Sequence, residues 1–201
     1  MMSTFSYLAL GDSYSIGEQV PFAENFPNHL VQILRKKGFA FYAAEIIAKT
    51  GFTTDELLHA IENTITLKTY DFVTLLIGVN NQYRGRAVVD FEIELKQLLQ
   101  KAIQFAGDKP SRVFVVSIPD WGVTPFAEGR DRKKIAEEID VYNYACEAIA
   151  KKYRCNYINI TASQREDGNK EIFLVSDGLH PSGKEYLKWA QKLADAFIKQ
   201  L

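Results

Sequence analysis

The stretch Tyr7-Leu8-Ala9-Leu10-Gly11-Asp12-Ser13 joins a short apolar run directly to a polar turn. Four consecutive apolar residues are typical of a strand that is buried on both faces, as in a parallel sheet covered by helices. The turn places a serine hydroxyl where this strand ends. That serine is either a candidate nucleophile or an ordinary turn residue, because Gly, Asp and Ser are all common in turns.

Four further runs of the same kind follow along the chain. They are short and rich in Val, Ile, Leu and aromatic residues, and they lie at Ala44–Ala48, Phe72–Ile77, Arg112–Ile118 and Asn156–Ile160. The intervening segments repeat apolar residues at helical spacing. This alternation predicts an α/β fold: a single domain over residues 1–201, built as a doubly wound, flavodoxin-like α/β/α sandwich around a five-stranded parallel sheet. Ligands of such folds bind beyond the carboxyl ends of the strands.

Helix boundary signals support this division of the chain. Thr53-Thr54-Asp55-Glu56 predicts a capping box at the start of one helix. Pro181 is expected in the first turn of the last helix. The inner face of the helix that follows the capping box is expected to carry Leu57, Leu58, Ile61 and Ile65.

Composition narrows the classes of function. The 24 basic and 25 acidic residues leave a net charge of -1, which gives no reason to expect a nucleic-acid partner. Cys146 and Cys155 lack metal-site spacing and are expected to be buried free thiols in a reducing compartment. No apolar segment is long enough to span a bilayer. A cleavable leader would have to include the strand before Ser13, so we expect a cytoplasmic protein.

An acid and a histidine lie three residues apart near the other end of the chain, in Asp177-Gly178-Leu179-His180. His29 and His59 lie inside helical patterns, so His180 is the candidate general base for Ser13. Asp177 is placed to fix its tautomer and to stabilise the imidazolium. Short Asp–His spacing also occurs in ordinary loops and in metal sites. No HExxH or CxxC motif accompanies this one, and we predict neither a metal nor a cofactor.

Two further strand ends carry candidate oxyanion donors. Asn80 follows the most hydrophobic strand, and its carboxamide can donate to a tetrahedral intermediate. The backbone N–H groups of Ser13 and Gly51 are its expected companions. Each residue also has a plain structural interpretation: Asn80 as a turn residue, and Gly51 as a glycine needed only for a positive φ.

These blocks together resemble the SGNH subgroup of the GDSL esterases and lipases. Gly11-Asp12-Ser13 matches the first block, Gly51 the second, Gly78-Val79-Asn80 the third, and Asp177-x-x-His180 the last. The resemblance implies the SGNH-hydrolase fold, a Ser-Asp-His triad and an oxyanion hole formed by Ser13, Gly51 and Asn80. Asn81 stands where the third block usually has Asp, which keeps the donor Asn80 but changes the side chain available to support its loop.

The expected activity is hydrolysis of a small-molecule carboxylic ester through an acyl-serine intermediate. The loops around the crevice offer apolar walls and candidate anion contacts, but no sequence pattern identifies the substrate. The sequence also does not indicate the oligomeric state. The expected substrate contacts are Tyr14, Tyr83, Arg84, Trp121 and Phe126, with Phe22, Arg86 and Arg130 as further candidates.

Other functions fit the same sequence. An acyltransferase or a sugar-ester deacetylase would use the same triad. A non-catalytic flavodoxin-like binding domain, such as a flavin protein, would keep the fold alone. Such a domain is expected to carry a phosphate-binding loop after the first strand, and Gly11-Asp12-Ser13-Tyr14-Ser15 is only a faint version of one.

Overall fold

The buried apolar runs form one parallel sheet in the computed structural model, which describes residues 4–201; residues 1–3 of the predicted domain lie outside the described residues. The strand order is β2-β1-β3-β4-β5, and every pairing is parallel. The predicted five-stranded α/β fold is therefore confirmed. The strands are β1 (Tyr7–Asp12), β2 (Glu45–Lys49), β3 (Phe72–Leu76), β4 (Val113–Val116) and β5 (Asn156–Ile158).

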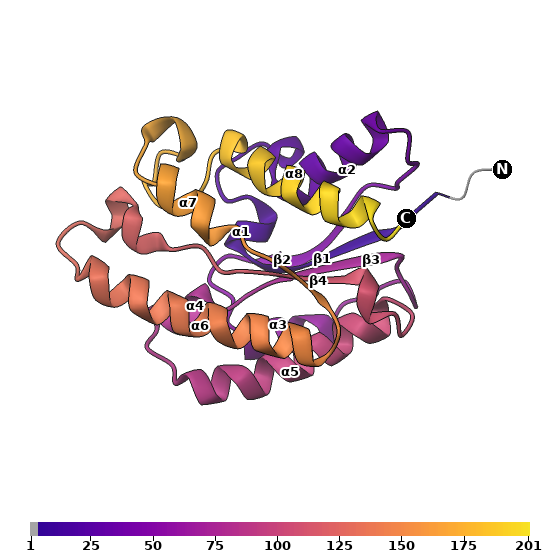
Figure 1. The fold of residues 1–201 in the computed structure, drawn as a ribbon, viewed down its shortest axis with the longest axis horizontal. Helices are drawn as coiled ribbons and strands as arrows, with labels where there is room; N and C mark the ends of the chain where they lie inside the picture. The colour runs from indigo at the N-terminus through magenta and orange to yellow at the C-terminus, as the bar shows by residue number, and fades with distance from the viewer. Residues whose placement is uncertain (1–3) are drawn as a thin grey trace.

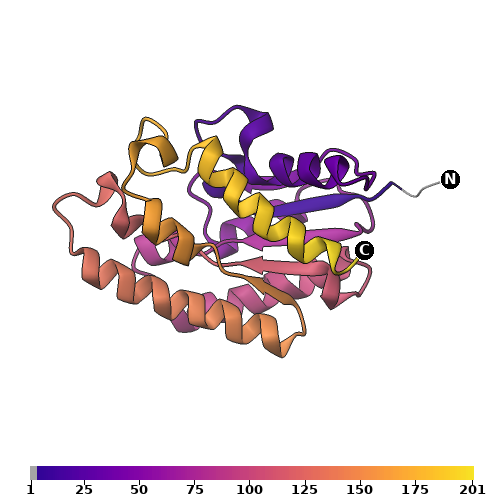
Figure 2. The ribbon, with the colours of Figure 1, turned by 45° about the horizontal axis from the view of Figure 1, so that its top comes forward.

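Helices cover both faces of the sheet (Figure 1). On one face, α2 (Phe26–Lys36) packs against α8 (Gly183–Ile198). The other face is covered by α3 (Thr54–Glu62), α5 (Val88–Phe105) and α6 (Arg132–Lys152), as the rotated view in Figure 2 also shows. Within residues 4–201, no helix has both the length and the apolar character needed to cross a membrane.

Short elements connect these layers. Three helices of four to seven residues are α1 (Ser13–Ile16), α4 (Val79–Tyr83) and α7 (Thr161–Asp167). Single 3-10 turns are η1 (Phe22–Glu24), η2 (Pro110–Arg112), η3 (Trp121–Val123), η4 (Pro125–Ala127) and η5 (Glu171–Phe173). The helical periodicity of the sequence did not indicate α1, α4 or α7, because such segments contain less than two full turns.

Aromatic packing joins the sheet to α8. The ring of Phe197 stacks on Phe72 with centroids 4.5 Å apart and lies 4.4 Å from the ring of Phe114. All three side chains are fully buried, and each such burial stabilises the fold by about 1.5–3 kcal/mol. The buried hydroxyl of Tyr7 is satisfied by Thr74 at 2.7 Å.

Two of the predicted helix boundaries differ from the structure, whereas the predicted capping box is confirmed at the start of α3. The expectation that Ile65 faces inward is wrong: α3 ends at Glu62, and Ile65 is fully exposed. The side chain of Thr64 hydrogen-bonds back to a carbonyl of the last turn at 2.7 Å, which favours termination over another turn. Pro181 lies before α8, where it forms an isolated bridge with Leu174.

The strand order places a topological switch between β1 and β3. Strand β1 pairs with β2 on one side and with β3 on the other, so the connections leave the sheet in opposite directions there. A crevice opens at such a point at the carboxyl ends of the strands. Ser13 follows β1 and Asn80 lies just beyond β3, so both begin at this edge.

Candidate active site

Ser13 is held at the start of α1 by its neighbours. Asp12 is the N-cap, and its carboxylate accepts a hydrogen bond from the backbone N–H of Tyr14 at 3.0 Å. The N–H of Gly17 donates to the carbonyl of Ser13 at 3.1 Å. A Cβ at Gly11 would overlap the Ser15 hydroxyl and lie 2.5 Å from the carbonyl oxygen of a β3 residue, so only glycine lets α1 fold back against the sheet.

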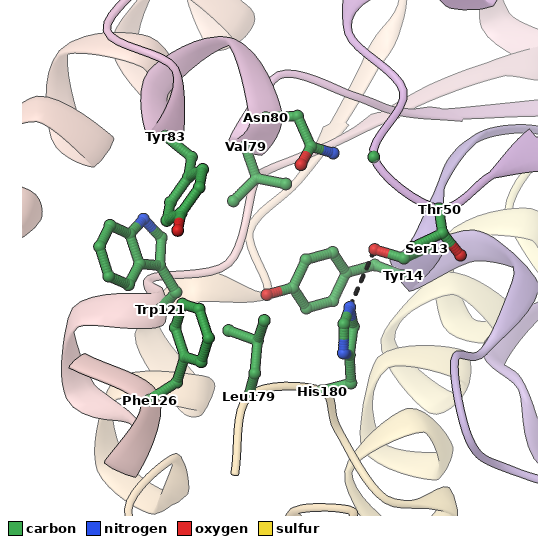
Figure 3. A pocket seen from close by; sticks show the side chains of 11 residues that line it. Ser13, Tyr14, Thr50, Val79, Asn80, Tyr83, Trp121, Phe126, Leu179 and His180 are labelled. Atoms are coloured by element: carbon green, nitrogen blue, oxygen red, sulfur yellow. Dashed lines mark hydrogen bonds between the residues drawn. The ribbon is translucent and has the colours of Figure 1, made fainter. Parts of the chain in front are cut away.

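Ser13, His180 and Asp177 form a continuous chain of hydrogen bonds. His180 Nε2 lies 2.9 Å from Ser13 Oγ, which is the dashed line in Figure 3. His180 Nδ1 lies 2.6 Å from Asp177 Oδ2. The other carboxylate oxygen of Asp177 accepts from the backbone N–H groups of Leu179 at 2.8 Å and His180 at 2.9 Å. The structure thus brings together three residues that are up to 167 positions apart.

The groups around Asp177 keep its carboxyl ionised. Burial by itself raises the pKa of the Asp177 carboxyl, but hydrogen bonds from the His180 ring and from two backbone N–H groups outweigh it and hold the pKa below its usual value. His180 is only 7% exposed, and the ring of Tyr14 lies 5.0 Å from its imidazole. A buried imidazole beside an ionised carboxylate is suited to accept a proton from the serine hydroxyl.

Asp12, the last residue of β1, is a second carboxyl next to Ser13, and its environment differs from that of Asp177. It is fully buried, and burial raises its pKa to about 7. One oxygen caps α1, and the other lies 3.5 Å from the carboxamide nitrogen of Asn80. Asp12 therefore links the start of α1, which carries Ser13, to the start of α4, which carries Asn80.

Asn80 and Gly51 face the same cavity as Ser13. One N–H of Asn80 is held by the carbonyl of Phe52 at 3.0 Å, and Figure 3 shows the carboxamide nitrogen on the side of the cavity where Ser13 lies. Gly51 has a φ of +85°, and a Cβ there would meet protein only at Arg84, 3.6 Å away. The positive φ, and not a lack of space in the protein, is what requires glycine at position 51.

Asn81 stands where the family that the motifs resemble usually has Asp, and it connects the start of α4 to α3 from a buried position. Its carboxamide oxygen accepts from the backbone N–H of Thr54 at 3.1 Å, and its nitrogen donates to the hydroxyl of Thr54 at 2.6 Å. The Thr54 hydroxyl then donates to the carboxylate of Glu94. A hydroxyl has one proton, so an aspartate at position 81 and Glu94 would compete for it. The amide of Asn81 avoids that competition.

Replacing Asn81 by aspartate is expected to lower the free energy of unfolding by about 1–3 kcal/mol, because a buried carboxylate would lose its donor and face Glu94. Glu94→Gln supplies an amide donor to Thr54 and is expected to restore part of the loss. Urea denaturation of the wild type, both single variants and the double variant measures the coupling. An equal cost of Asn81→Asp with either residue at position 94 would exclude this explanation.

A cavity of about 190 Å³ opens in front of Ser13 and is largely apolar (Figure 3). Four of the expected contacts line it, whereas Arg84 and the further candidates Arg86 and Arg130 do not. Phe22 is also absent from the lining and is 66% exposed. Sequence reasoning missed three lining residues that directly adjoin predicted ones: Thr50, Val79 and Leu179. The lining residues are Ser13, Tyr14, Thr50, Gly51, Val79, Asn80, Tyr83, Trp121, Phe126, Leu179 and His180.

Trp121 forms a wall of this cavity that hydrogen bonds hold in place. Its indole N–H donates to Gln82 at 2.7 Å, and Gln82 donates in turn to Glu138 at 2.7 Å. Asp120, the preceding residue, is fully buried and pairs with Arg165 at 2.7 Å. The wall is therefore anchored to α4, α6 and α7, which favours a cavity of fixed size.

Other chemistry-bearing groups lie apart from this cavity. Cys146 is buried and Cys155 is partly buried; neither forms a disulfide, and burial raises the pKa of each thiol to about 12. Among residues 4–201, no three His, Cys, Asp or Glu side chains gather in an arrangement suited to a metal ion.

Solved structures share the fold at low sequence identity. TesA is 18% identical, with 98% of this chain and 99% of that chain covered and a TM-score of 0.76. The psychrotrophic esterase EstA from Pseudoalteromonas sp., in a structure inhibited by monoethylphosphonate, is 16% identical over 97% of each chain, with a TM-score of 0.73. Axe2, an acetylxylan esterase from Geobacillus stearothermophilus, is 18% identical over 99% of this chain and 94% of that chain, with a TM-score of 0.71. No curated protein sequence matches the chain.

The α/β/α fold, with a serine, a histidine and an aspartate hydrogen-bonded in series at one sheet edge, is typical of a hydrolase. The chain belongs to the GDSL-like lipase/acylhydrolase family, whose model matches residues 9–187. It is therefore a carboxylic ester hydrolase, and the resemblance to GDSL esterases predicted from its motifs is confirmed.

Proposed function

We propose that this protein is a serine esterase that hydrolyses small-molecule carboxylic esters through an acyl-serine intermediate. The observation that carries the proposal is the hydrogen-bonded series from Ser13 Oγ to His180 Nε2, at 2.9 Å, and from His180 Nδ1 to Asp177 Oδ2, at 2.6 Å. A serine hydroxyl is a weak nucleophile unless a neighbouring base takes its proton during attack.

In the proposed reaction, Ser13 Oγ attacks the ester carbonyl while His180 Nε2 takes its proton. The carbonyl oxygen becomes an oxyanion that accepts hydrogen bonds from the backbone of Ser13 and Gly51 and from the Asn80 carboxamide. When the tetrahedral intermediate collapses, His180 gives the proton to the leaving alcohol. A water molecule then repeats attack and collapse on the acyl-serine, which releases the acid and returns the proton to Ser13.

The cavity limits the substrate. At about 190 Å³ with mostly apolar walls, it favours a short acyl chain or a single aromatic ring next to the ester. Axe2, which shares this fold, is an acetylxylan esterase, and this supports a small acyl group.

A fluorophosphonate probe and a series of 4-nitrophenyl esters of increasing chain length test the proposal. Wild type and Ser111→Ala, an exposed serine before β4, are expected to be labelled and active, and Ser13→Ala neither. Hydrolysis is expected to fall as the acyl chain outgrows the cavity. Labelling that persists in Ser13→Ala would show that another residue is the nucleophile. Acid as the main product in the presence of added alcohols distinguishes a hydrolase from an acyltransferase.

Asn80→Ala is expected to lower kcat by about 10²–10³-fold with little change in KM, because the lost donor acts mainly on the oxyanion. Steady-state kinetics with a 4-nitrophenyl ester measures this effect. Since Asn80 also contacts Phe52, thermal unfolding of the variant serves as the control. A change confined to KM would mean that Asn80 binds the substrate ground state instead.

A further inference from the structure

Three arginines near the cavity differ in what neutralises them. Arg84 pairs with Glu56 at 3.3 Å, and Arg86 pairs with Asp55 at 2.5 Å. These two guanidinium groups hold the segment after α4 to the first turn of α3, and their charges are already matched by carboxylates. The third, Arg130, has no such partner: within residues 4–201, no carboxylate oxygen lies within 4.0 Å of its guanidinium.

Arg130 lies instead over three aromatic rings. Its guanidinium carbon is 5.5 Å from the ring centres of Tyr83 and Trp121 and 6.0 Å from that of Phe126. Its polar contact is with the Tyr83 hydroxyl at 3.4 Å. Contact with ring faces holds a guanidinium in place without using up its in-plane N–H donors. Arg130 is exposed, so these donors are accessible to a ligand.

The rings beneath Arg130 form one end of the cavity. Figure 3 shows Tyr83, Trp121 and Phe126 together on the side away from Ser13 and His180, with apolar side chains between the two groups. The rings contact one another, with centroids 5.3 Å apart for Tyr83 and Trp121 and 6.0 Å apart for Trp121 and Phe126. Arg130 does not itself line the cavity, but its guanidinium contacts three of the rings that do. A substrate whose ester is at Ser13 and whose body extends past these rings can therefore reach Arg130.

We propose that the substrate is an ester bearing a carboxylate at the end far from the reacting carbonyl, and that Arg130 binds this carboxylate. The inference rests on the proposed esterase function and names the substrate class of the same site. A planar guanidinium matches a carboxylate with two parallel hydrogen bonds. The apolar cavity then accepts the carbon skeleton between the two polar ends.

Two matched substrate pairs test this subsite, one with the charge on the acyl part and one with it on the alcohol part. The first is the 4-nitrophenyl monoester of adipic acid against 4-nitrophenyl hexanoate. The second is 4-carboxyphenyl acetate against 4-methylphenyl acetate. The measured quantity is the ratio of kcat/KM for the anionic to the neutral ester, in wild type, Arg130→Ala and Arg130→Lys. Comparing this ratio between variants cancels the intrinsic reactivity of each ester.

In at least one pair, Arg130→Ala is expected to lower the ratio about tenfold, with Arg130→Lys in between, because lysine keeps the charge but not the planar fork. The wild-type ratio is also expected to fall as salt is added. Lys133→Ala removes a nearby solvent-facing charge and is expected to leave the ratio unchanged.

A ratio unaffected by Arg130→Ala in both pairs would overturn the subsite. An equal fall in Lys133→Ala would also overturn it, because the effect would then come from overall charge. Failure of the esterase proposal is distinguishable, since wild type would then hydrolyse neither the neutral nor the anionic esters and would not react with the fluorophosphonate probe.

Discussion

Ser13→Ala is expected to lower kcat by about 10⁴–10⁶-fold, the loss typical of removing the nucleophile of a serine triad. His180→Ala is expected to lose a similar amount, because Ser13 Oγ has its hydrogen-bonding base in His180 Nε2 at 2.9 Å. The double variant is expected to be no slower than either single variant, since nucleophile and base act on the same step. Active-site titration and kcat measurements on the three variants check this non-additivity.

Folding controls are straightforward for these two positions. Ser13→Ala removes one hydroxyl, whereas His180→Ala also leaves Asp177 Oδ2 without its imidazole partner. Thermal unfolding is therefore expected to shift more for the histidine variant than for the serine variant. If the two losses multiplied in the double variant, the residues would act on separate steps, and the proposed proton transfer between them would be excluded.

Asp177→Asn is expected to lower kcat by about 10⁴-fold with the fold intact. The amide oxygen can still accept from the backbone N–H groups of Leu179 and His180. Its NH₂ group, however, would face His180 Nδ1 and favour the tautomer with the proton on Nε2. In that tautomer Nε2 donates to Ser13 and cannot take its proton.

Asp177→Asn also tests how the stability of the folded protein depends on pH. The pKa of Asp177 is lower in the folded protein, so the ionised carboxylate stabilises the fold above its unfolded pKa, and this contribution is lost as pH falls through the folded value. The stability difference between wild type and Asp177→Asn is therefore expected to be largest near neutral pH and to shrink in acid. Asp195→Asn, at an exposed position of α8, is the matched control for the same change of residue type. Full activity in Asp177→Asn would contradict the orienting role.

The sheet could be predicted from the sequence because its strands are buried on both faces. Tyr7–Leu10 and Phe72–Ile77 are apolar at nearly every position, and β1 and β3 are buried throughout. The convergence of Ser13 with Asn80 then follows from strand ends that share one edge. The meeting of His180 with Ser13 was predicted on other grounds: His29 and His59 lie in helical patterns, and Asp177 precedes His180 by three residues. The motif order of a known family agreed with this choice, whereas the loop before α8 has no periodicity to place it.

Contacts between distant side chains outside the predicted triad and oxyanion hole could not be predicted from the sequence. The support of Asn81 by Thr54 and Glu94 spans three elements, and no local pattern relates these residues. From the sequence alone, Arg84 and Arg130 are both interpreted as arginines in loops near the crevice. Only their neighbours separate them: a carboxylate and a carbonyl for Arg84, and aromatic rings for Arg130.

The wall that carries Trp121 and Phe126 belongs to the connection between β4 and α6, whereas Ser13 and Asn80 follow β1 and β3. Substitutions in this connection can therefore change substrate preference at the Trp121 end of the cavity without altering the sequence around Ser13 or Asn80. One contact limits this freedom: the backbone N–H of Phe126 donates to the carbonyl of Gly178, in the loop that carries His180. Variants that keep this hydrogen bond are expected to keep the connection in register with that loop while its side chains diverge.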